Sequence, residues 1–129
     1  MKIAFAFIVK DGEEYLETNL HAIKQFQQDV YAVENNSTDN TKNILNNAGL
    51  KKVLTLNLDE RHSTELCQGT NNCSKRVRRL AYLRQQALTS VMTSKVVYDY
   101  VCMLDMDFAM FNSEGLLSMF KYMQQHPDV

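Results

Sequence analysis

Residues 2–9, Lys-Ile-Ala-Phe-Ala-Phe-Ile-Val, form a nearly unbroken apolar run with no alternation between apolar and polar side chains. A run of this kind suits a strand that is covered on both faces, as the strands of a parallel sheet are. Asp11 and Gly12 end the run, and apolar residues at three- and four-residue steps then predict an amphipathic helix from Glu13 to about Gln28. The N-terminus therefore predicts the opening strand and helix of an alternating α/β fold.

The same alternation continues to the end of the chain. Further strands are expected at 30–33, 52–57 and 97–104, and further helices around 44–48, at 75–93 and from 113 onward. The polar stretch 59–74 has the composition of a loop. The inward face of the helix at 75–93 is expected to carry Val77, Leu80, Ala81, Leu88 and Val91. This order predicts a three-layer α/β/α sandwich with a mostly parallel, Rossmann-like sheet.

Composition limits the class of protein. With 129 residues, 45% of them hydrophobic, the chain is expected to form a single domain with a real core. Fourteen basic and fifteen acidic residues give a net charge of -1, which argues against a nucleic-acid partner. No run approaches the roughly 20 apolar residues of a membrane span, and the first apolar run has no cleavage signature after it. We therefore expect a soluble, cytoplasmic protein with no transmembrane segment.

The three cysteines, Cys67, Cys73 and Cys102, are an odd set in a chain with ordinary core content. We interpret them as reduced thiols in a cytosolic protein, with Cys102 inside the last strand as part of the core. Cys67, Cys73 and the nearby His62 give only three candidate ligands at a spacing that matches none of the common zinc patterns. A zinc site is therefore not expected.

Asp105 and Asp107 follow the last apolar strand directly, separated by Met106. Ligands of open parallel sheets bind beyond the carboxyl ends of the strands, and two carboxylates there suit a divalent cation with a diphosphate. Mg²⁺ and Mn²⁺ both fit such oxygen ligands. The alternative is a polar turn after a strand, because Asp is common in turns.

Two other groups of polar residues lie near expected strand ends or on an inward helix face. Arg84 shares a four-residue spacing with core leucines, and Arg76 lies near that face, so each either meets an anion such as phosphate or pairs with an acid of the sheet edge. Arg78 and Arg79 are expected to be solvated. The segment 34–39, Glu-Asn-Asn-Ser-Thr-Asp, either caps a helix through Ser37 or Thr38 or contacts a nucleoside through Glu34.

Three features together resemble the GT-A-fold glycosyltransferases. They are the first strand followed by Lys-Asp-Gly-Glu at 10–13, the segment Glu-Asn-Asn-Ser-Thr-Asp-Asn-Thr at 34–41, and the strand that ends in Asp-x-Asp at 98–107. The likeness is closer to fungal mannosyltransferases of capsule and mannan synthesis and to some viral glycosyltransferases, whose Arg-x-x-x-Leu-Ala-x-x-Arg-Asn helix is matched at 76–85 except that Gln85 replaces Asn.

The resemblance implies a function and a set of contacts. It implies a sugar donor linked to UDP or GDP, a glycan or glycoprotein acceptor, and a Mn²⁺ or Mg²⁺ ion held by Asp105 and Asp107. The backbone of Phe7 to Val9 would line the base pocket, and Arg76 and Arg84 would meet the phosphates. The remaining implied donor contacts are Glu34, Asn36, Ser37, Asp39 and Asp105.

The likeness covers only the donor-binding half of such an enzyme, since these domains carry further elements after the Asp-x-Asp that supply the acceptor site. We therefore assign no catalytic base. One alternative is a non-catalytic module that binds nucleotide sugars. Another is a haloacid-dehalogenase-like phosphatase, which also places Asp-x-Asp after an apolar strand. The phosphatase needs a downstream lysine and acidic motif, and only 22 residues follow Asp107.

Overall fold

The computed structural model describes residues 1–59, 67, 74–106 and 112–128. These residues form four strands and four helices. The strands are β1 (Ile3–Val9), β2 (Asp29–Asn35), β3 (Lys52–Leu56) and β4 (Tyr100–Asp105), and the helices are α1 (Glu13–Lys24), α2 (Thr41–Asn46), α4 (Lys75–Met92) and α5 (Ser113–Gln125). All four strands are parallel and lie in the order β3-β2-β1-β4. The predicted α/β fold with a parallel sheet is confirmed, and it is compatible with a Rossmann-like architecture.

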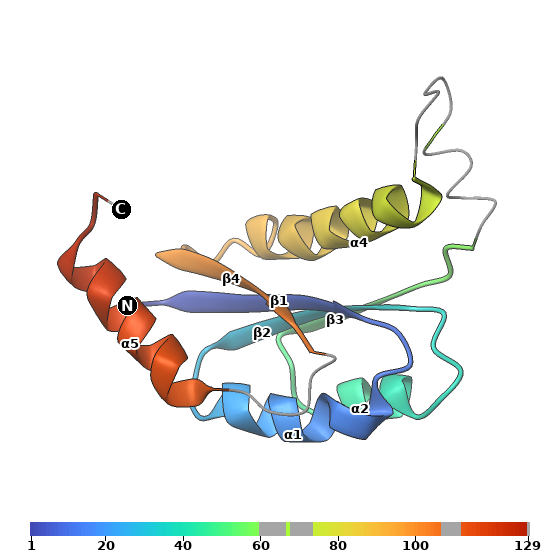
Figure 1. Cartoon of the computed structure of the whole chain (residues 1–129), viewed down its shortest axis with the longest axis horizontal. Helices are drawn as coiled ribbons and strands as arrows, with labels where there is room; N and C mark the ends of the chain where they lie inside the picture. The colour runs from blue at the N-terminus through green and yellow to red at the C-terminus, as the bar shows by residue number, and fades with distance from the viewer. Residues whose placement is uncertain (60–66, 68–73, 107–111, 129) are drawn as a thin grey trace.

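The helices cover the two faces of the sheet (Figure 1). Helices α1 and α2 lie on one face together with part of α5, and α4 lies on the opposite face, across β1 and β2. The chain moves outward from β1 to β3 on the first face and then returns by way of α4 to place β4 on the other side of β1. The strand order therefore reverses between β1 and β4, which is where open α/β sheets bind their ligands.

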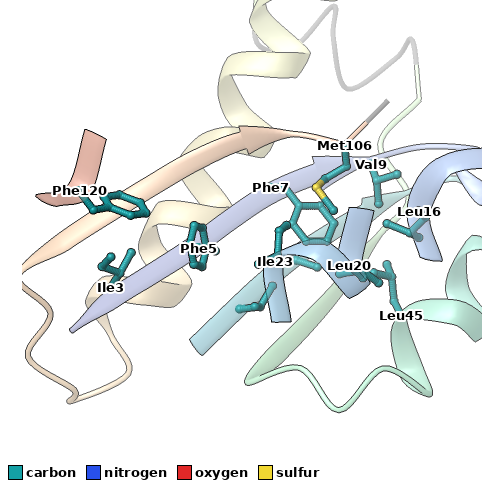
Figure 2. Packing of buried hydrophobic residues seen from close by; sticks show 12 residues of the cluster. Ile3, Phe5, Phe7, Val9, Leu16, Leu20, Ile23, Leu45, Met106 and Phe120 are labelled. Atoms are coloured by element: carbon teal, nitrogen blue, oxygen red, sulfur yellow. The ribbon is translucent and has the colours of Figure 1, made fainter. Parts of the chain in front are cut away.

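Strand β1 is the centre of the core because it has neighbours on both edges and helices over both faces. Its odd-numbered residues, Ile3 to Val9, face α1 and α5, while Ala4 and Ala6 face α4. Phe5 packs against Phe120 of α5 with ring centroids 6.0 Å apart. Figure 2 shows these aromatic and aliphatic side chains gathered on one face of the strand. Burial on both faces explains why residues 2–9 show no polar alternation.

Some element boundaries and faces differ from those predicted. Helix α1 ends at Lys24 instead of near Gln28, since Gln27 has a left-handed backbone with φ 54° that cannot continue a helix. Strand β4 begins at Tyr100 instead of residue 97, and Tyr98 just before it donates a hydrogen bond from its hydroxyl to Asp29. Desolvation, followed by that hydrogen bond, raises the pKa of Tyr98.

The inward face of α4 was predicted only in part. Val91 does pack against the sheet and Leu80 is partly buried, but the buried stripe runs through Leu83 and Ala87, and Val77 is 59% exposed. Val77 precedes Leu83 by six residues, which places it about 120° around the helix axis from Leu83. Ala81 is exposed as well.

The expectation of three reduced thiols is wrong. Cys67 is disulfide-bonded, and Cys102 is free and half-buried, with burial raising the pKa of its thiol. An odd number of cysteines still permits a disulfide, so the cysteine count does not support a cytosolic location. In the described part of the chain, no helix has the length and apolar character needed to cross a membrane.

Candidate functional site

A crevice of about 490 Å³ opens at the carboxyl ends of β1 and β4, below the N-terminal half of α4. Its position is the switch point where the strand order reverses. Its walls are formed by Ile8, Val9, Lys10, Asn35, Arg76, Arg79, Leu80, Leu83, Arg84, Asp105 and Met106. Three of the residues predicted to meet phosphate or metal, namely Arg76, Arg84 and Asp105, are thus brought together, although they lie up to 29 residues apart in sequence.

Positive charge dominates the crevice walls. Lys10 and three arginines of α4 face a single described carboxylate, that of Asp105. Arg76 and Arg84 were expected near this site, but Arg79 was expected to be solvated and instead lies half-buried in the wall. One side of α4 carries residues 76, 79, 80, 83 and 84, because steps of three and four residues return to the same helix face. A cationic, partly apolar crevice of this kind attracts an anion that also carries an apolar or aromatic part.

Arg84 and Asp105 form an ion pair with 3.5 Å between Nη2 and Oδ1. The sequence left open whether Arg84 pairs with an acid or meets an anion, and in the structure it pairs with Asp105. The two side chains are 46% and 69% exposed, so water screens their attraction and the pair contributes little to stability. An incoming phosphate can therefore compete for Arg84, and an incoming cation can compete for Asp105, at small cost.

The end of β4 is held in place by a buried amide that the sequence interpretation missed. Asn19 of α1 is fully buried and donates from Nδ2 to the carbonyl oxygen of Met106, 3.2 Å away. Strand pairing fixes the preceding residue, since Asp105 pairs with Ile8 of β1. The sequence did contain a signal for this role of Asn19. It lies three residues after Leu16 on the inward face of α1, where a polar residue needs a buried partner.

The described residues offer one of the two predicted metal ligands. Asp105 lies in the crevice wall, and Asp107 lies outside the described residues. Within the described ranges there is no group of three or more His, Cys, Asp or Glu residues that could hold a metal ion. Mg²⁺ usually takes one or two carboxylates and completes its shell with phosphate oxygens and water. Asp105, whose side chain is 69% exposed, is one carboxylate of the kind that such an ion uses.

The predicted contacts in the segment 34–39 lie on the other side of the same sheet edge. There the loop after β1 and the loop after β2 are joined by a set of hydrogen bonds between residues 11–13 and 37–41, which we call the loop lock. The backbone N–H of Asp11 donates to Ser37 Oγ (3.0 Å), that of Gly12 to Thr41 Oγ1 (2.9 Å), and that of Glu13 to Asp39 Oδ2 (3.1 Å). In the reverse direction, the backbone N–H of Thr38 donates to Asp11 Oδ1 (2.6 Å).

The loop lock engages Ser37 and Asp39, two of the residues that the resemblance implied as donor contacts. Asp39 Oδ1 accepts from both the backbone N–H and the hydroxyl of Thr41, at 2.9 and 2.5 Å. Desolvation opposes ionisation of Asp39, but the hydrogen bonds from Thr41 and Glu13 outweigh it and lower the pKa of this carboxyl. Helix α2 begins after Asn40, so the expectation that Ser37 or Thr38 is its N-cap is wrong.

Glu34, Asn36 and Phe7 also lie away from the crevice wall. Glu34 is fully buried, with Oε1 accepting from the backbone N–H of Ser37 at 2.6 Å. Asn36 donates from Nδ2 to the carbonyl of Leu58 at 2.7 Å. Phe7 is buried in the core on the α1 side, where Figure 2 shows it beside Met106, while Val9 does line the crevice. A nucleotide-binding role for Glu34, Asn36, Ser37, Asp39 and Phe7 stays a prediction.

Among the described residues, the site is thus a cationic crevice at the switch point of a parallel sheet, with one exposed carboxylate in its wall and a hydrogen-bonded pair of loops beside it. Position and charge indicate the class of ligand, an anion bound at the carboxyl edge. Comparison with models of protein families, with curated proteins and with solved structures finds no match to this chain.

Proposed function

We propose that this chain binds a nucleoside diphosphate sugar in the crevice and serves in the transfer of its sugar to a glycan or glycoprotein acceptor. The observation that carries the proposal is the meeting of Arg76, Arg84 and Asp105 at the switch point of the sheet. The crevice volume of about 490 Å³ also falls within the range of roughly 300–1,000 Å³ that is usual for small-molecule sites.

In the proposed complex the diphosphate lies against α4. Arg76 and Arg84 each present a planar set of N–H donors that match phosphate oxygens in pairs. Ile8 and Val9 at the end of β1 also line the crevice, and a base or sugar can lie against them. A Mg²⁺ or Mn²⁺ ion bound with the diphosphate would use Asp105, together with Asp107, and would stabilise the negative charge that builds on the leaving phosphate.

A second candidate is a nucleotide-sugar-binding module that carries out no transfer. It is favoured by one observation: among the described residues of the crevice wall, Asp105 is the one carboxylate, and it is paired with Arg84. The described wall residues therefore include no further carboxylate to act as a general base. The two candidates share the donor site and differ in whether the bound donor is ever cleaved.

Thermal unfolding of the purified chain with UDP, GDP and their sugar conjugates, with and without Mn²⁺, tests the proposal. A ligand present at a hundred times its dissociation constant adds about 2.7 kcal/mol to the free energy of unfolding, which shifts the melting temperature by several degrees. We expect such a shift with the conjugates of one nucleotide and none with adenosine. Absence of a shift with every nucleotide would refute the proposal.

Release of free nucleotide from the bound conjugate then separates the two candidates. With Mn²⁺ present, a transferase is expected to hydrolyse its donor slowly or to transfer the sugar to added glycans. Tight binding with no cleavage in the presence of any acceptor supports the binding module instead.

A further inference from the structure

The chain leaves the sheet at the end of β4, and the pairing of strands stops there. The last pair that joins β4 to β1 is Asp105 with Ile8, and among the described residues β4 has no strand on its outer side. A strand end of this kind opens readily, because few hydrogen bonds oppose its opening. The position of the Asp105 carboxylate in the crevice wall therefore depends on what holds the chain just after it.

The side chain of Asp105 is not fixed by its own surroundings. It is 69% exposed, so burial does not position it. Its ion pair with Arg84 joins two exposed side chains, and water screens the attraction between them. The place of this carboxylate therefore follows from the backbone of residues 105 and 106.

Met106 is anchored twice, by its side chain and by its carbonyl group. The side chain is 1% exposed and packs in the core beside Phe7, as Figure 2 shows, while the residue also lines the crevice. The carbonyl oxygen accepts a hydrogen bond from Nδ2 of Asn19, 3.2 Å away, and Asn19 is fully buried. Loss of this donor would leave a buried carbonyl group without its partner, which favours opening of the strand end.

We propose that Asn19 is a positioning residue of the site: by holding Met106, it keeps the Asp105 carboxylate at the crevice wall, where a divalent cation bound with a diphosphate meets it. Groups that orient a metal ligand without touching the ion change metal affinity by about 10- to 100-fold when they are removed. This inference rests on the proposed function for the cation and the diphosphate. It goes beyond that proposal by naming a residue of α1 that acts through Asp105 without lining the crevice.

The first measurement is hydrogen exchange of the backbone amides in the full chain without ligand. Asn19→Leu keeps a similar volume and removes the donor. Its matched control is Ile23→Val, which removes one methyl group from a fully buried residue one turn further along α1. We expect the amides of residues 103–106 to exchange about tenfold faster in Asn19→Leu than in Ile23→Val.

Equal exchange of these amides in the two variants would overturn the inference. If Asn19→Leu does not fold, judged by circular dichroism, the smaller replacement Asn19→Ser is measured in its place with the same expectations.

The second measurement is the affinity for UDP and for GDP, by isothermal titration in Mn²⁺ and in EDTA. In Asn19→Leu we expect the strengthening of nucleotide binding by Mn²⁺ to be about tenfold smaller than in the wild type, with the affinity in EDTA unchanged within about twofold. Ile23→Val should keep the full Mn²⁺ effect. A purely structural role of Asn19 would lower stability without altering this ratio, so an unchanged Mn²⁺ effect in Asn19→Leu would overturn the inference.

A double variant tests whether the amide acts through the carboxylate. Once Asp105→Asn has removed the carboxylate, adding Asn19→Leu is expected to cause no further loss of the Mn²⁺ effect, because the two residues act as one unit. A further loss in the double variant would show that Asn19 acts by another route and would contradict the proposed role.

The result is separable from the fate of the proposed function. If the wild type binds neither UDP nor GDP, the proposed function fails for these donors, and the hydrogen exchange alone decides whether Asn19 holds the end of β4. If a nucleotide binds equally well with and without Mn²⁺, the donor site stands and this inference fails.

Discussion

The loop lock and the crevice occupy two halves of the same sheet edge, and both are rich in polar residues, but they use those residues in opposite ways. In the loop lock, side chains of one loop accept hydrogen bonds from backbone N–H groups of the other, as between Thr41 and Gly12. In the crevice, guanidinium groups of α4 line open space of about 490 Å³. A position after a parallel strand is thus not enough to mark a ligand contact. Whether a polar group bonds to a neighbouring loop or lines the crevice depends on the face of the sheet to which the chain turns.

The largest expected effect comes from removing the two motif arginines of the crevice. The double variant Arg76→Gln/Arg84→Gln is expected to lower the affinity for the responding nucleotide about 100-fold, or ~2.7 kcal/mol, because two charged contacts to phosphate are lost. Its free energy of unfolding should hardly change, since Arg84 makes only an exposed ion pair. Isothermal titration and urea unfolding measure the two quantities.

The control for that prediction is Arg78→Gln/Lys121→Gln, which removes the same net charge outside the crevice wall. If the control loses as much affinity as the crevice variant, the binding depends on overall charge and not on the crevice.

A smaller effect, on stability alone, is expected from the loop lock. Thr41 is fully buried, and Thr41→Val keeps its shape while removing both hydrogen bonds of its hydroxyl, to Gly12 and to Asp39. We expect a loss of about 1 kcal/mol in the free energy of unfolding, because the partly buried backbone N–H of Gly12 is left without this acceptor. Urea unfolding at neutral pH measures it, with Thr55→Val at an exposed position of β3 as the matched control.

Nucleotide affinity provides the sharper comparison for Thr41→Val. If the two halves of the edge are independent, affinity should stay within about twofold of the wild type. A fall in affinity that parallels the fall in stability would show that the loop lock supports the crevice walls.

The smallest expected effect is a pH dependence of the loop lock. The pKa of Asp39 is lowered in the folded chain, so its stabilising contribution is fully present above its unfolded pKa of about 3.9 and is lost as the pH falls through the folded pKa. The difference in unfolding free energy between the wild type and Asp39→Asn should therefore shrink as the pH falls below about 4. Urea unfolding between pH 7 and pH 3 measures this difference, with Asp128→Asn near the C-terminus as the control. A difference that stays constant over this range would argue against ionic hydrogen bonds at Asp39.

Local sequence determined the elements and their order. The apolar run of β1 predicts burial on both faces, and apolar spacing in α1 and α4 predicts helices, because these signals lie within a few residues of one another. The same local spacing predicted Arg84 on an inward helix stripe and Asp105 at a strand end, and the fold brings both to one crevice. The parallel sheet follows from the alternation of strands and helices.

Tertiary structure alone decided how the polar residues are used. Thr41 and Gly12 are 29 residues apart, and Asn19 and the carbonyl of Met106 are 87 apart, so no local pattern reveals that they bond. Arg78 and Arg79 are equivalent by residue type, and only the orientation of α4 over the sheet turns one into the crevice and leaves the other in water. Periodicity reports which residues share a face, whereas the packing of distant elements determines what that face meets.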